Sequence, residues 1–152
     1  MSSRNDQVLE AMIRRQQMRV DAAQRTLAEA GQRRDAVIAG LDRLIEAQDR
    51  LPRVASFDQR DGFDLHAYRR TLQWLDDLET RIARQRVALA EAETAIENAR
   101  QKCFDEADRL RAIEDGRIRE RAASDAAAGQ RSQREADARW LQRRPPPPRI
   151  MV

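Results

Sequence analysis

Residues 9–51 carry the clearest structural signal in the chain and read LEAMIRRQQMRVDAAQRTLAEAGQRRDAVIAGLDRLIEAQDRL. Apolar side chains recur in this stretch at alternating steps of three and four residues, a spacing that keeps them on one face of an α-helix. Six heptads of this pattern predict a long helix whose apolar seam packs against another helix. The seam consists of Leu9, Ile13, Val20, Ala23, Leu27, Ala30, Val37, Leu41, Leu44 and Leu51, interrupted only by Gln16, Arg34 and Gln48.

A second periodic series predicts a second long helix. We expect Pro52 to end the first helix, because proline lacks a backbone donor and disfavours the helical conformation of the residue before it. Asp64 is the expected N-cap of the second helix, with Phe63 placed to pack on Tyr68. The second series comprises Tyr68, Leu75, Ile82, Leu89, Ile96, Cys103 and Leu110, flanked by Leu65, Leu72, Leu78, Ala92, Ala99 and Ala107. The expected parts are a helix over 3–51, a connector over 52–64, a helix over 65–139 and a proline-rich flexible tail over 140–152.

The short connector predicts that the two helices pair antiparallel. Setting Leu51 beside Leu65 brings Leu27 to Leu89, so that the two apolar seams face each other along their length. The expected fold is therefore all-α: a long antiparallel two-helix coiled-coil hairpin whose second helix overhangs the first. A parallel homodimer through the first helix would use the same seam, so the sequence leaves monomer and dimer open.

Composition argues against an enzyme. Charged residues make up 36% of the chain and aromatic residues 4%, and there is one His and one Cys. We therefore expect no catalytic, metal or cofactor site and no internal disulfide. No charged-then-apolar leader and no apolar run near the length of a membrane span is visible, which favours a cytoplasmic protein without direct membrane insertion.

The segment from Arg117 onward is basic, with nine arginines against four acidic residues. It can be read as a solvated helix, as a docking element for an acidic protein surface or as a nucleic-acid contact. Its interspersed acids and its single aromatic residue, Trp140, disfavour nucleic acid. Trp74 lies off the seam, one turn from Arg70 and Leu78, which is typical of an interface anchor.

The size of the chain, its N-terminal heptad helix and its longer charged second helix resemble the FliJ/YscO family of type III secretion central-stalk proteins. The run Leu9 to Arg25, with Arg14, Arg15 and Arg19 outside the seam, is similar to that family's basic first helix. The resemblance implies a rod like the γ subunit of rotary ATPases, inserted in a hexameric secretion ATPase and reaching toward the export-gate protein at the base of a secretion apparatus. The proline-rich end at 145–152 is not a family feature, and its role stays open.

The residues predicted to bind partners come from these features, namely Arg14, Arg15, Arg19, Trp74, Arg117, Arg119, Arg121 and Trp140. The resemblance also implies an alternative function, the escort of secretion chaperones, and a generic coiled-coil scaffold without an ATPase partner would share the same pattern. The sequence leaves open whether the system is flagellar or virulence-related and which end of the rod enters the ring.

Overall fold

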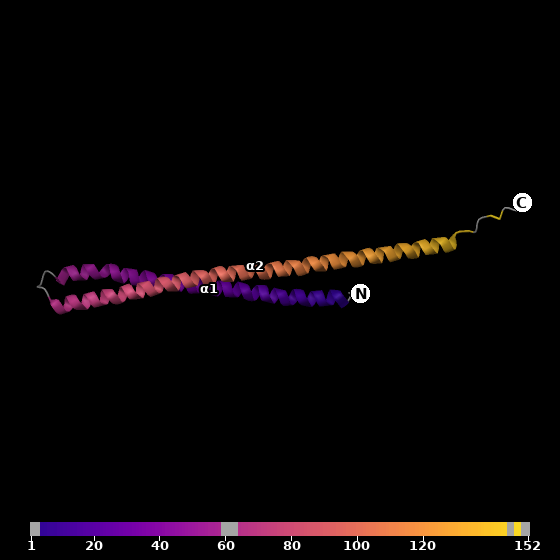
Figure 1. Ribbon diagram of the computed structural model, residues 1–152. Helices are drawn as coiled ribbons and strands as arrows, with labels where there is room; N and C mark the ends of the chain where they lie inside the picture. The colour runs from indigo at the N-terminus through magenta and orange to yellow at the C-terminus, as the bar shows by residue number, and fades with distance from the viewer. Residues whose placement is uncertain (1–3, 59–63, 146–147, 150–152) are drawn as a thin grey trace. The chain divides into compact units, whose positions relative to one another are not determined.

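Two long helices form the structure, a computed structural model that describes residues 4–58, 64–145 and 148–149. Helix α1 spans Arg4–Asp58 and helix α2 spans Leu65–Arg143 (Figure 1). The two helices pack against each other, and no residue in the described ranges belongs to a strand. The all-α class with two long packed helices is therefore confirmed.

Both helices extend further than the sequence suggested. Helix α1 continues through Pro52 to Asp58, seven residues beyond the expected end at Leu51. A proline in a helix removes one backbone hydrogen bond and crowds the carbonyl four residues earlier, but near the end of a long helix the remaining ladder is intact. Helix α2 includes Trp140 and ends at Arg143, four residues beyond the expected end at residue 139. The expected contact of Phe63 and residues 59–63 of the expected connector lie outside the described residues.

The start of α2 is capped as predicted. The Asp64 side-chain Oδ1 accepts hydrogen bonds from the backbone N–H groups of His66, at 3.0 Å, and Ala67, at 3.4 Å. The Asp64 carbonyl accepts the first helical bond, from the Tyr68 N–H, at 3.0 Å. Because the first turn of a helix has no internal partners for its N–H groups, this carboxylate fixes where α2 begins.

The packing face of α1 is the face that the heptad pattern predicts. Each seam position from Leu9 to Leu51 is buried or half-buried, including the interrupting Gln16, Arg34 and Gln48. On α2 the predicted seam positions are buried or half-buried from Leu75 onward. In the first turns of α2, however, the large residues Leu65, Tyr68 and Leu72 are exposed, which the sequence did not predict.

The chain divides into two compact units, and each helix passes through both. The larger unit comprises Met18–Ala107, and its core holds Ala23, Leu51, Leu78, Ile82, Ala92, Ile96 and Ala99. In this unit the helices run antiparallel, because Val37 contacts Gln85 while Ala23 shares a shallow groove with the later residue Glu106.

The predicted register is wrong. It placed Gln85 opposite Gly31, whereas the Gln85 side chain donates to the Val37 carbonyl at 3.2 Å and lies against Gly40, six to nine residues further along α1. A displacement close to one heptad keeps both seams aligned, because the apolar pattern repeats every seven residues. This displacement separates Leu65 from Leu51, which the predicted register had paired, and agrees with the exposure of Leu65.

The smaller unit joins Met1–Gln17 with Asp108–Val152. Its described buried side chains are Ile13 and Gln16. The Asn5 amide donates to Glu120 Oε1 at 3.2 Å, and Arg117 contacts Glu10, so the segments are antiparallel here too. Every described side chain from Ile118 to Pro145 is exposed.

Candidate functional site

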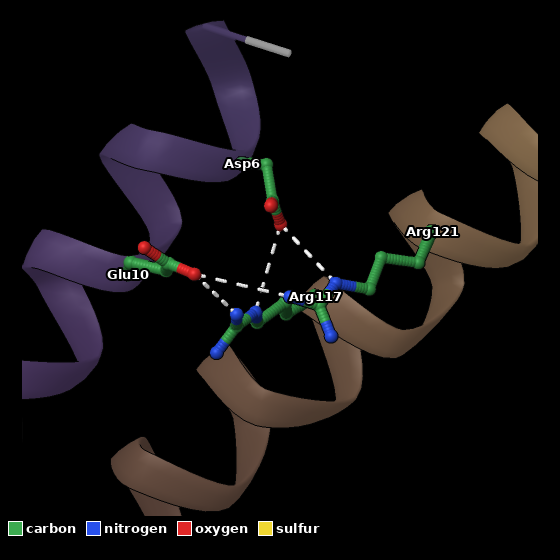
Figure 2. Close-up of polar contacts among 4 residues, drawn as sticks. All are labelled: Asp6, Glu10, Arg117 and Arg121. Carbon is green, nitrogen blue, oxygen red and sulfur yellow. Dashed lines mark hydrogen bonds and ion pairs between the residues drawn. The ribbon is translucent and has the colours of Figure 1, made fainter. Parts of the chain in front are cut away.

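Four charged side chains meet across the helices of the smaller unit (Figure 2). Asp6 and Glu10 lie one turn apart on α1, and Arg117 and Arg121 lie one turn apart on α2. Arg117 Nη2 donates to Glu10 Oε1 at 2.6 Å, and Arg117 Nε lies 3.6 Å from Asp6 Oδ1. Arg121 Nε lies 3.4 Å from the same Asp6 oxygen, and its Nη2 lies 3.8 Å from Glu10 Oε1. We call these four residues the ion clasp.

The ion clasp is partly shielded from solvent. The exposed fraction is 14% for the Asp6 side chain and 24% for that of Arg117, but 55% for that of Arg121. Exposed ion pairs typically contribute about 0–1 kcal/mol each, and salt weakens them, so the clasp is a modest contribution to stability. Two cations facing two carboxylates nevertheless define the register of α1 on α2 at this end.

One donor of the clasp is poorly satisfied. Arg117 Nε is buried, and among the described residues no acceptor makes a hydrogen bond with it. The Asp6 Oδ1 atom lies 3.6 Å from this nitrogen, beyond hydrogen-bonding distance. The aspartate side chain therefore does not fill the arginine fork completely.

A shallow groove runs beside the ion clasp in the same unit. It is bounded by Arg117 and Arg121 together with apolar and neutral groups and a carboxylate, namely Ile13, Gln17, Ile118 and Glu114. Ile118 is largely exposed although it borders this groove. The cations and the apolar wall together form a surface able to hold an amphipathic acidic segment.

The other residues predicted to bind partners are exposed but not gathered into one site. Arg14, Arg15 and Arg19 project from α1 into solvent. The Arg119 side chain is exposed, and its Nε donates to the Asp115 carbonyl at 3.4 Å. Of the eight predicted residues, the structure joins only Arg117 and Arg121 in one charge cluster.

The two tryptophans sit in different units. Trp74, in the larger unit, is exposed and borders a shallow hollow with Ala67, Arg70 and Thr71. Trp140, in the last turns of α2, is also exposed, and the Arg144 guanidinium lies 5.6 Å from the centre of its ring. That distance suits a cation–π contact, which at an exposed site contributes about 0.5–1 kcal/mol.

Reasoning from the sequence missed Asp6 and Glu10. The predicted register placed Arg117 beyond the N-terminal end of the first helix, so no α1 partner was expected for it. The available signal was the matching spacing: two acids four residues apart on α1 and two arginines four residues apart on α2. The buried Glu106 and the half-buried Gln85 on the α2 seam were also missed.

Among the described residues, no group of three or more His, Cys, Asp and Glu side chains is arranged to hold a metal ion. No described helix is long and apolar enough to cross a membrane. The expected lack of catalytic, metal and cofactor sites stays a prediction.

No protein-family model matches the chain, and neither a curated protein nor a solved structure matches it. The similarity to FliJ/YscO proteins therefore stays a prediction from architecture and charge pattern.

Proposed function

We propose that the chain is the central stalk and coupling protein of a type III secretion system. In this proposal it forms an antiparallel coiled-coil hairpin with an overhanging C-terminal part of α2. It binds the hexameric secretion ATPase and links it to the export-gate protein at the cytoplasmic base of the apparatus. The observation that supports the proposal best is the packing of two long helices through one face, which leaves charged side chains on the remaining surface.

A polar, asymmetric helical shaft suits a coupling function. Its exterior offers arginines and carboxylates whose exposed ion pairs are weak singly, so that contacts with successive ring subunits form and break at low cost. Arginine suits such contacts because its planar fork binds carboxylates with two hydrogen bonds. The exposed Arg14 and Arg15 of α1 are candidates for this role.

The test is ATP hydrolysis by the purified hexameric ATPase of the same secretion system. We expect the chain to raise the rate and to promote hexamers. Replacing Arg14 and Arg15 with Gln should weaken the stimulation, whereas the same change at Arg33 and Arg43, which are also exposed on α1, should weaken it less. An unchanged rate and assembly state at saturating concentrations of the chain contradicts the proposal.

The exposure of Trp74 favours a second candidate, a chaperone-escort adaptor. A large aromatic side chain in a solvent-facing hollow is typical of a protein-binding hot spot. For an adaptor, Trp74→Ala should weaken binding of a secretion chaperone about tenfold or more, measured by isothermal titration calorimetry, and leave the helicity of the chain unchanged. Chaperone binding without any binding to the ATPase favours the adaptor over the stalk.

A further inference from the structure

The two arginines of the ion clasp form a binding site for carboxylates, which we call the receptor, and their spacing is one helical turn. Arg117 and Arg121 lie one turn apart on α2 and meet two carboxylates that are also one turn apart, on Asp6 and Glu10 (Figure 2). The receptor is therefore matched to a helix that presents acidic side chains at positions i and i+4. The chain itself supplies such a helix.

The internal carboxylates fit this receptor imperfectly. Only the contact between Arg117 Nη2 and Glu10 Oε1, at 2.6 Å, is short. The Asp6 oxygen stays 3.6 Å from Arg117 Nε, which leaves that buried donor without a hydrogen bond. A glutamate reaches one carbon further than an aspartate, so a helix with glutamates at both positions is better suited to the arginine pair than the chain's own segment.

The first turns of α1 are held with little apolar contact. The buried side chains of this segment, Ile13 and Gln16, lie after the two clasp acids. Between Arg4 and Met12 the deepest positions are only half-buried, and the large side chains of Val8 and Met12 are exposed. Displacing these turns therefore exposes little apolar surface and breaks partly exposed ion pairs.

We propose that Arg117 and Arg121 form a docking site for an acidic helix of a partner protein, and that Asp6 and Glu10 are an internal occupant which this helix displaces. The incoming helix presents two glutamates one turn apart to the arginines and an apolar side chain to the exposed Ile118. The buried Ile13 keeps the rest of α1 in place during the exchange. This docking site does not depend on the ATPase partner proposed above.

The probe is a fluorescein-labelled, alanine-based peptide of about 20 residues, long enough to be helical, with glutamate pairs four residues apart. Its binding to the full chain is followed by fluorescence anisotropy at low salt. We expect the variant Asp6→Asn/Glu10→Gln to bind the peptide about fivefold or more tightly than the wild type, since the internal competitor is lost. Arg117→Gln/Arg121→Gln should abolish this gain when it is combined with the first variant.

Two matched controls separate the site from net charge. Asp21→Asn/Glu29→Gln removes the same two charges from exposed positions of α1 and should bind the peptide as the wild type does. A peptide with glutamine in place of glutamate should not distinguish the clasp variant from the wild type. Equal affinity of the wild type and the clasp variant for the acidic peptide overturns the proposal, as does an equal gain in the Asp21/Glu29 control.

A crosslink tests displacement without removing any clasp charge. Asn5 and Glu120 are in direct contact, so cysteines at these positions, in a Cys103→Ser background, can be joined with a short bismaleimide. The joined chain should bind the acidic peptide at least about fivefold more weakly than the unjoined chain. Undiminished binding by the joined chain overturns the proposal, even if the arginine variant proves less helical than the wild type.

Discussion

Replacing Gly40 with alanine tests how closely the Gln85 side chain of α2 packs against Gly40 of α1 in the larger unit. In a helix interior alanine is about 1 kcal/mol more favourable than glycine. A Cβ on Gly40, however, would lie 2.9 Å from the Gln85 side-chain nitrogen, which donates to the Val37 carbonyl. The amide must move, and loss of its hydrogen bond costs about 1 kcal/mol. The two effects oppose each other, so we expect Gly40→Ala to change the free energy of unfolding by less than about 0.5 kcal/mol.

Gly31→Ala is the matched control for this experiment. Nothing lies within 4 Å of a Cβ built on Gly31, so this substitution should stabilise the chain by the full helix-propensity gain of about 1 kcal/mol. Both variants are compared with the wild type by urea unfolding followed by far-ultraviolet circular dichroism. In a Gln85→Ala background, Gly40→Ala should become as stabilising as Gly31→Ala. An equal gain at both glycines in the native background refutes the close contact between Gln85 and Gly40, and with it the observed register.

Three further predictions follow from burial, capping and charge. Ile82→Ala should destabilise the chain by about 2 kcal/mol or more in the same unfolding assay, because Ile82 is only 5% exposed. Ile118→Ala, at a 65% exposed site, should cost less than about 0.5 kcal/mol. Similar losses at both positions would contradict the observed burial. Asp64→Ala should cost about 1 kcal/mol through loss of the N-cap, while Asp64→Asn, which keeps an acceptor oxygen, should cost little. Raising sodium chloride to about 1 M, where the Debye length is about 3 Å, weakens the ion clasp. Amide hydrogen exchange should therefore speed up more in residues 4–17 than in the seam around Ile82. An unchanged exchange rate in residues 4–17 would count against the ion clasp as the anchor of this segment.

Much of the secondary structure was predictable because its signals are local. The heptad pattern identified the buried face of α1, and Asp64 identified the start of α2, since capping needs only a side-chain oxygen and the next N–H groups. The end of α1 was not predictable from Pro52, because a helix continues through a proline when the surrounding turns supply enough hydrogen bonds.

Only the arginines of the candidate site were predictable from the sequence. The basic run singled out Arg117 and Arg121 as binding residues, but their contacts with Asp6 and Glu10 depend on which turn of α1 faces which turn of α2. The spacing of charges along one helix does not say which turn of the other helix lies opposite. In the register expected from the sequence, Asp6 would lie opposite Leu110 and Glu10 opposite Glu106, away from both arginines.

The amino-acid sequence was sufficient to predict that the chain forms two long helices and which face of α1 is buried. Both follow from the three- and four-residue steps of apolar side chains along each helix. The register, in contrast, comes from the packing of the two helices, because a seam that repeats every seven residues matches its partner almost equally well after a shift of one heptad. The choice depends on polar contacts that differ from one heptad to the next, such as the fit of Gln85 against Gly40 and the ion pairs of Arg117 with Asp6 and Glu10.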